Sequence, residues 1–242
     1  AGQAADAGSP RRDAAGGDAP GLDAPGLDAW ARSLDGRVTR NASRRVEAVR
    51  LGFTWVTDGD LDRIAKLASL RSLDLSSTRV TDLGIERLQG LTQVRELNLF
   101  AAEHISDTAL AHLRQWTNLK RLNLRGTDIT DTGLAYLAGH KGLESLDISI
   151  TLITDNGLDH LAALDQLREL AVGGNKLTDA GLLVLRVLPR LKSLRLGGKQ
   201  MRNSGYWSVA VTDLAMDSVV ELSGLENLDL AGLKITDLGA EK

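Results

Sequence analysis

Cysteine is absent from this chain of 242 residues, so disulfide bonds and thiolate-bound metal sites are excluded. Aromatic residues make up only 3% of the sequence, and any core must therefore be built from aliphatic side chains. No apolar stretch approaches the roughly 18 residues that a membrane-spanning helix requires. Neither sign of charge is in large excess, because the net charge is only −3 and the pI about 5.8. The composition thus gives no general attraction for nucleic acid or for an anionic membrane surface.

A stretch of about 24 residues recurs from Leu51 to the end of the chain. Its clearest copies begin at Leu70, Leu119 and Leu143 and read LRSLDLSSTRVTDLGIERL, LKRLNLRGTDITDTGLAYL and LESLDISITLITDNGLDHL. The last apolar residue of each predicted strand recurs at Leu51, Leu75, Leu99, Leu124, Ile148, Val172, Leu196 and Leu230. A Thr-Asp or Ser-Asp pair recurs at 57–58, 81–82, 106–107, 130–131, 154–155, 178–179, 212–213 and 236–237. Such regular spacing predicts an array of single units that stack side by side.

The Leu-x-x-Leu-x-Leu pattern, as in Leu70, Leu73 and Leu75, resembles the leucine-rich-repeat family over about residues 46–240. The form Thr-Asp-x-Gly-Leu-x-x-Leu is similar to a bacterial subgroup found in planctomycete and acidobacterial secreted proteins. The resemblance implies an α/β solenoid of about eight 24-residue repeats, with a parallel inner sheet and short outer helices. It also implies an extracytoplasmic location, periplasmic or secreted, and membership of a larger assembly.

Each repeat has a readable physical logic. Leu73 and Leu75 alternate with polar neighbours, which predicts a strand with one buried face. The Thr-Asp pair then starts a helix, in which one residue caps free N–H groups and the carboxylate favours the positive end of the helix dipole. We assign each Asp to its own helix rather than to a calcium site, because no second column of ligands accompanies it. A small residue two positions later, such as Gly84, predicts close packing of adjacent turns.

Two segments precede the repeats. Residues 1–27 are rich in Ala, Gly, Asp and Pro, and they offer too little apolar surface to offset the entropy of ordering. We expect a flexible linker there, or an extended tail on a partner. Residues 28–50 predict a cap, with a short helix over 28–34 that starts at Asp28 and strands over 37–40 and 45–51. The solenoid then occupies 51–242, and Phe53 and Trp55 are expected to pack under the cap or tail.

Two repeats break the period. The third carries one extra residue within 100–104, and the seventh carries about ten within 197–208. Exposed aromatic residues in irregular loops are typical interface anchors, which favours partner contacts by Phe100, Tyr206 and Trp207. The alternative is that these loops fold back and bury them.

Strand alternation also predicts the side chains of the inner face. Four arginines and five carboxylates are interspersed there, an arrangement that argues against a nucleic-acid groove and suits a protein surface. The predicted partner-binding residues are therefore Asp74, Asn98, Phe100, Arg121, Asn123, Arg125, Asp147, Arg195, Tyr206 and Trp207.

The sequence carries no signature of catalysis or of metal binding. Its histidines form no His-x-x-x-His or Glu/His cluster, and those at 112 and 160 are expected on the outer surface. There is no Gly-x-Ser-x-Gly elbow, and the Gly-Gly pairs at 173–174 and 197–198 lack the helix and Lys-Ser/Thr of a phosphate loop. We expect neither an enzyme nor a bound cofactor.

These features predict a non-catalytic protein–protein interaction or scaffold module, which binds its partner through the concave sheet face and the seventh-repeat insertion. Two alternatives stay open. The chain is an architectural subunit of a larger extracytoplasmic membrane or redox complex, or it is the targeting domain of a secreted bacterial effector. Because the last predicted helix reaches Lys242, we expect further residues or a partner to cover that end.

Overall fold

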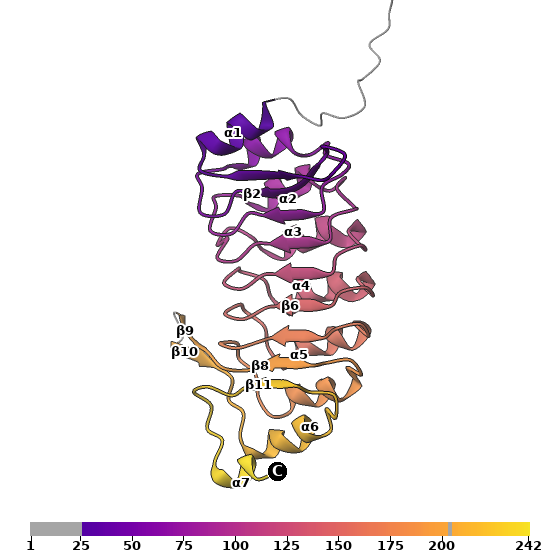
Figure 1. Cartoon of the computed structure of the whole chain (residues 1–242). Coiled ribbons are helices and arrows are strands. Elements are labelled where there is room, and N and C mark those ends of the chain that lie inside the picture. The colour runs from indigo at the N-terminus through magenta and orange to yellow at the C-terminus, as the bar shows by residue number, and fades with distance from the viewer. Residues whose placement is uncertain (1–25, 203–204) are drawn as a thin grey trace, which may run out of the picture.

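The computed structural model describes residues 26–202 and 205–242, without the side chains of 201–202 and 205–207. Its body is a solenoid in which the strands stack into one sheet and the helices stack on the opposite side (Figure 1). The strand order is β1-β2-β3-β4-β5-β6-β7-β8-β11, with β1 antiparallel to β2 and the remaining neighbours parallel. The predicted solenoid, with a parallel sheet on one face and short helices on the other, is confirmed.

The elements of the body are short because each repeat turns twice within about 24 residues. The strands are β2 (Val46–Arg50), β3 (Ser72–Asp74), β4 (Glu96–Asn98), β5 (Arg121–Asn123), β6 (Ser145–Asp147), β7 (Glu169–Ala171), β8 (Ser193–Arg195) and β11 (Asn227–Asp229). The α-helices are α2 (Asp82–Arg87), α3 (Asp107–His112), α4 (Asp131–Ala135), α5 (Asp155–Leu158), α6 (Met216–Val220) and α7 (Asp237–Ala240). Short 3₁₀-helices are η1 (Asp58–Arg63), η2 (Leu113–Gln115), η3 (Tyr136–Gly139), η4 (Asp159–Ala163), η5 (Gly181–Val187) and η6 (Asp213–Ala215).

A helix and a hairpin close the N-terminal end, as predicted. They are α1 (Leu27–Ser33) and the pair of β2 with β1 (Arg37–Arg40). The helix begins one residue earlier than expected, with Gly26 as its N-cap, so the prediction of Asp28 as the cap was wrong. Asp28 instead accepts a hydrogen bond from Arg40 at 2.6 Å, and this guanidinium lowers the pKa of the carboxyl. Residues 1–25 of the predicted tail lie outside the described residues.

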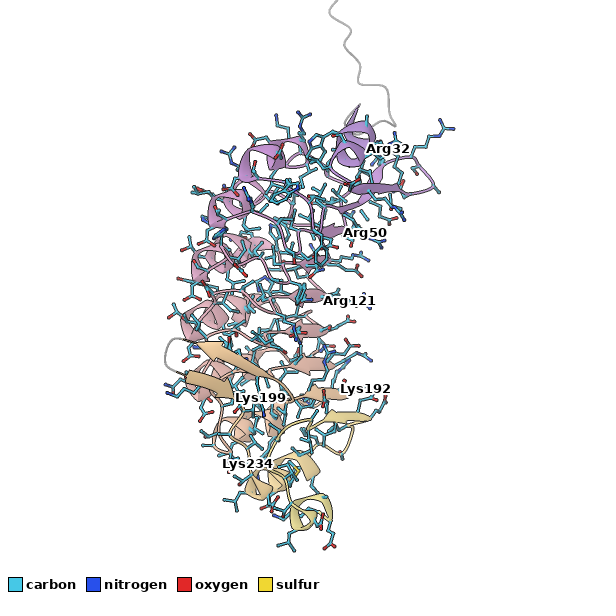
Figure 2. All side chains as sticks on the ribbon, turned by 90° about the vertical axis from the view of Figure 1, so that its left-hand side faces the viewer. Arg32, Arg50, Arg121, Lys192, Lys199 and Lys234 are labelled. Carbon is cyan, nitrogen blue, oxygen red and sulfur yellow. The ribbon has the colours of Figure 1, made fainter. Side chains whose placement is uncertain are left out.

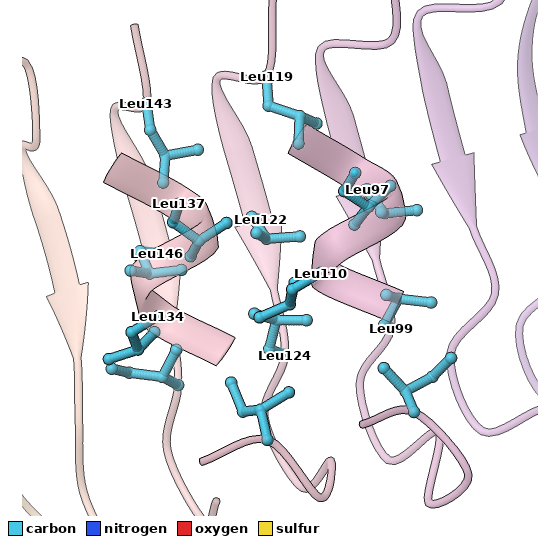
Figure 3. Packing of buried hydrophobic residues seen from close by; sticks show 14 of the residues in the cluster. Leu97, Leu99, Leu110, Leu119, Leu122, Leu124, Leu134, Leu137, Leu143 and Leu146 are labelled. Atoms are coloured by element: carbon cyan, nitrogen blue, oxygen red, sulfur yellow. The ribbon is translucent and has the colours of Figure 1, made fainter. Parts of the chain in front are cut away.

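Columns of leucine run through the core from repeat to repeat (Figure 3). The strand register places the leucines of β3 to β8 side by side, and these are Leu73, Leu97, Leu122, Leu146, Leu170 and Leu194. All of them are at most 2% exposed. Leu110, Leu134 and Leu137 face them from the helices, which closes the space between the two layers. Each buried leucine contributes about 1.5–3 kcal/mol, so the period of the sequence is the main source of stability.

The Thr-Asp pairs connect neighbouring repeats, which corrects the assignment of each Asp to its own helix. Thr81 does cap its own helix, because its Oγ1 accepts from Leu83 N at 3.2 Å. The carboxylate of the preceding repeat, Asp58, accepts from Thr81 N at 2.8 Å and from Thr81 Oγ1 at 2.7 Å. The same two hydrogen bonds join each further pair along the stack, namely Asp82–Ser106, Asp107–Thr130, Asp131–Thr154, Asp155–Thr178, Asp179–Thr212 and Asp213–Thr236. These bonds form a ladder along the stack, which we call the Asp ladder.

The small residue after each Asp is explained by this ladder. A Cβ built on Gly84 would lie 2.3 Å from Asp58 Oδ1, closer than any real contact allows. The glycine therefore makes room for the carboxylate of the repeat before it. The predicted close packing of adjacent turns is confirmed, and its physical cause is the ladder.

The apolar columns become exposed at β11. Leu228 is 40% exposed, whereas Leu194, its neighbour in register, is 0% exposed. No strand pairs with the other edge of β11 within residues 26–202 and 205–242. A leucine of the column is thus buried only where the next repeat covers it.

Candidate interaction surface

The side chains of the strands project from the inner face of the sheet, where Arg50, Arg121 and Lys192 are visible in Figure 2. A hollow of about 330 Å³ lies over β3 to β6, and Arg50 of β2 and Arg195 of β8 complete its lining. Six of the ten predicted partner-binding residues line it, namely Asp74, Asn98, Arg121, Asn123, Asp147 and Arg195. Strand stacking has therefore brought together residues that are far apart in sequence, up to the 121 positions that separate Asp74 from Arg195.

Most charges of this concave hollow are already paired across strands. Arg121 donates to Glu96 at 2.6 Å, and Arg195 lies 3.3 Å from Asp147. Exposed pairs of this kind contribute about 0–1 kcal/mol to stability, so they hold little of the fold together. Their effect is to present both signs of charge in fixed positions, which a partner can replace with its own.

Four of the predicted residues also end their strands. Oδ1 of Asp74 accepts from Ser76 N at 3.0 Å, and Oδ1 of Asn98 accepts from Phe100 N at 3.1 Å. Asn123 and Asp147 make the same bond two residues ahead. Local bonds of this type are the usual reason for Asn and Asp at turns. These side chains therefore have a structural role that alternation alone did not predict.

Phe100 and Arg125 do not belong to the concave hollow, which corrects their assignment to the inner face. They follow β4 and β5, and they line a second hollow of about 490 Å³ at the turns after the strands. Gln200 also lines this second hollow. The alternation of the strand ends at the Asn residues, so the chain has already turned toward the flank of the sheet.

The seventh-repeat insertion forms a hairpin of β9 (Lys199–Arg202) and β10 (Gly205–Ser208). It crosses the flank of the solenoid at the turns after the strands (Figure 2). Buried Gln200 fixes it there, because its Nε2 donates to Thr151 O and to Gly174 O, each at 2.6 Å. Tyr206 and Trp207 lie in β10, and their side chains are outside the described part of the chain. Their role in binding stays a prediction.

Metal sites and membrane spans were also sought in the structure. Across the described residues, His, Asp and Glu never gather in a group of three or more that is placed to hold a metal ion. In the same residues no helix has both the length and the apolarity to cross a membrane.

His140 is a core residue that the sequence did not distinguish from the other histidines. It is 0% exposed and occupies the column of Leu164 and Leu188, in register with Trp116 of the previous repeat. Its Nε2 lies 3.2 Å from Leu113 O and its Nδ1 3.3 Å from Leu137 O. Burial lowers the pKa of the imidazole below its ordinary value, because the charged form loses its hydration.

Acid is expected to destabilise the protein through His140. The folded pKa lies below the unfolded one, so the stabilisation is complete above about pH 6.5 and is lost as the pH falls through the folded pKa. The His140→Leu variant restores the residue of the column and should lose less Tm between pH 7 and pH 5 than the wild type. Thermal unfolding at both pH values measures this. Equal losses of Tm in the two proteins would assign the acid sensitivity to other groups.

Comparison with known proteins agrees with this geometry. The family model described as Leucine Rich repeat matches residues 66–88, 117–138 and 167–185. No curated protein matches the sequence at a significant level. Internalin C2 from Listeria monocytogenes has a similar structure, with a TM-score of 0.58 and 24% identity over 79% of this chain and 81% of that one. The PEPR1–AtPEP1 structure gives a TM-score of 0.51 and 17% identity over 82% of this chain, which spans only 26% of that one. The matched repeats, the similar solved structures and the stacked sheet together show that the chain has a leucine-rich-repeat solenoid fold.

Proposed function

We propose that this chain is a non-catalytic module that binds a protein partner through the concave face of its sheet. The observation that carries the proposal is the concave hollow, where six polar side chains from five repeats converge over the stacked strands. The strands beneath it are held in register by backbone hydrogen bonds and by leucine columns. A rigid surface of this kind loses little conformational entropy on binding, which favours affinity.

The mixture of charges supports a protein as the partner. Arg121 and Arg195 alternate with Glu96 and Asp147 over the hollow, so no single sign of charge dominates. A nucleic-acid surface would be consistently basic. A protein surface offers donors, acceptors and both charges at similar spacing, and it can exchange pairs with this face. The similar PEPR1–AtPEP1 structure pairs two named components, in keeping with such a role for the fold.

The setting of the module is part of the same proposal. The form Thr-Asp-x-Gly-Leu supports a bacterial, extracytoplasmic protein that works within a larger assembly. The seventh-repeat hairpin, with Tyr206 and Trp207 in β10, is proposed as an additional anchor beside the concave face.

Reversing one charge of the concave face tests the proposal. Arg121→Glu places a carboxylate beside Glu96 and removes a donor from the hollow. Capture of partners by a photo-crosslinking residue at position 123, in an extract of the native source, should fall about tenfold, which corresponds to about 1.4 kcal/mol.

The matched control is Arg186→Glu, which breaks the exposed pair of Arg186 with Glu221 on the helix side. It should leave the yield of the crosslinked protein unchanged, and both variants should keep the wild-type Tm. Equal capture by wild type and Arg121→Glu, or equal loss in the two variants, would contradict binding through the concave face.

A further inference from the structure

The residue three positions after the end of each strand from β2 to β8, and after the end of β11, adopts a left-handed backbone. These residues are Phe53, Ser77, Ala101, Gly126, Ile150, Gly174, Gly198 and Gly232, with φ between 50° and 135°. The turn requires this conformation, because it points the N–H group at the next repeat, as in Phe53 N to Ser76 O at 2.7 Å. Glycine adopts it without strain, and it does so in half of the column.

Phe53 and Ile150 are not explained by the stability of the turn. Their φ angles are 61° and 56°, and an aromatic or β-branched residue in this region is a genuine outlier. Phe53 is also 76% exposed, so burial of its side chain does not offset the energy of the strained backbone. Trp55 is 73% exposed as well, so the expectation that Phe53 and Trp55 pack under the N-terminal cap was wrong, and its alternative, packing under the tail, concerns residues 1–25, which lie outside the described residues. Strained residues of this kind concentrate at functional sites.

These residues lie in two hollows that adjoin along the turns. The first, of about 410 Å³, is lined by Phe53, Trp55 and Arg79. The second, of about 490 Å³, is lined by Arg125 and Ile150. Both include Ala101 and Glu103, and we call the combined surface the turn furrow. From Phe53 to Ile150 it crosses four repeat steps, or about 19 Å, which about six residues of extended chain would span.

Both departures from the repeat period border the turn furrow. The extra residue of the third repeat lies within 100–104, which supplies Glu103 where the two hollows meet. The seventh-repeat hairpin contributes Gln200, which its bonds to Thr151 and Gly174 hold against the second hollow. The irregular parts of the sequence have thus been placed on one flank of the molecule.

The chemistry of the turn furrow changes along its length. At one end the Arg79 guanidinium lies 4.7 Å from the centre of the Trp55 ring. The Trp55 and Phe53 rings both line this end and give it an apolar surface. In the middle, the exposed Glu103 carboxylate has no hydrogen bond or ion pair with any residue that the structure describes. At the other end the Arg125 guanidinium is likewise unpaired within the described side chains, whereas Asp128 already has a partner.

We propose that the turn furrow is a second docking site, which binds an extended segment of a partner protein. Covering an unpaired charge is costly unless the ligand pairs with it. The segment must therefore carry an apolar side chain for Phe53 and Trp55, a basic one for Glu103 and an acidic one for Arg125, in that order. A polypeptide offers all three groups within six residues, whereas nucleic acid or an anionic membrane would set phosphates against Glu103. This site is independent of the concave face.

Selection of random ten-residue peptides displayed on phage against the purified chain tests this inference. The enriched peptides should share an apolar, a basic and an acidic residue in this order along the chain, all read in the same one of the two chain directions. A synthetic peptide with the enriched sequence should bind at least tenfold more weakly to Phe53→Gly and to Trp55→Ser. Phe53→Gly should meanwhile keep or raise Tm, because glycine suits the left-handed backbone.

Charge reversal gives a second readout. Glu103→Lys should weaken binding of the same peptide, and a peptide whose basic residue is replaced by Glu should restore it. Two controls should leave peptide binding unchanged, namely Leu183→Ser on the helix side, where Leu183 is 52% exposed, and Arg121→Glu on the concave face.

The inference would be overturned if no enriched peptide depends on Phe53 or Trp55, or if Phe53→Gly lowers Tm. It would also be overturned by binding of single-stranded oligonucleotides or of phosphatidylserine vesicles that requires Phe53 and Arg125. Loss of peptide binding in Arg121→Glu alone would assign the peptide to the concave face and separate the two proposals.

Discussion

Leu146→Asp is expected to abolish cooperative folding of the solenoid. Leu146 is 1% exposed and lies in β6, between Leu122 and Leu170 of the neighbouring strands. The substitution removes a buried aliphatic side chain, at a cost of about 2–5 kcal/mol, and adds an unpaired carboxylate to the core. The sum approaches the whole stability of an ordinary domain, about 5–15 kcal/mol. Circular dichroism during urea unfolding should show loss of the native transition.

Leu228→Asp is the matched control for this prediction. Leu228 occupies the same register position in β11, but it is 40% exposed. The carboxylate introduced there keeps much of its hydration, so the free energy of unfolding should fall by only about 1 kcal/mol. A Leu146→Asp protein that unfolds within about 1 kcal/mol of the wild type would show that the leucine column does not hold the stack together.

Gly157→Val should be the second most damaging of the substitutions considered. A Cβ at Gly157 would lie 2.3 Å from Asp131 Oδ1 and 3.0 Å from Ile153 Cγ2. Asp131 would have to move, which breaks its bonds to Thr154 N at 2.8 Å and Thr154 Oγ1 at 2.6 Å. Overpacking together with the lost hydrogen bonds should lower the free energy of unfolding by about 3 kcal/mol.

Two comparisons show whether this loss runs through the Asp ladder. Gly157→Ala adds the Cβ without the two methyl groups of valine and should cost less, because the stack accommodates a Cβ at the equivalent Ala109 and Ala215 with the ladder intact beside them. In an Asp131→Ala background, Gly157→Val should cost less than it does alone, since the carboxylate that it displaces is gone. Urea unfolding of the four proteins of the cycle measures the coupling. Additive losses would mean that Gly157 and Asp131 act separately.

The repeated sequence does not reveal which repeat supplies the hydrogen-bond partners of each Asp in the ladder. The Thr-Asp-x-Gly spacing is visible at every copy, and it correctly indicated a helix start and close packing. A bond from Asp131 to its own repeat and a bond to Thr154 are equally compatible with that spacing, because every copy carries the same residues. Only the stacking distance between repeats selects the second arrangement.

The candidate site was predicted in part for a similar reason. Alternation along a strand determines which side chains share a face, so Asp74, Arg121 and Asp147 were correctly grouped. It carries no information once the strand has ended, and Phe100 and Arg125 were therefore misplaced. The breaks of the repeat period at 100–104 and 197–208 pointed to part of the turn furrow, but Phe53 and Ile150 gave no such signal, because they stand where the backbone would favour glycine.

By itself, the sequence determined the fold of this protein. A period of about 24 residues with leucine at strand spacing admits one economical solution, which is a stack with a parallel sheet and an aliphatic core. The tertiary structure alone decided the partners of the side chains between repeats, the role of His140 and the position of the two irregular loops on one flank. The physical reason is that these features depend on contacts 23 to 49 positions apart, as in Asp131–Thr154 and Gln200–Thr151, which exist only after the repeats have stacked.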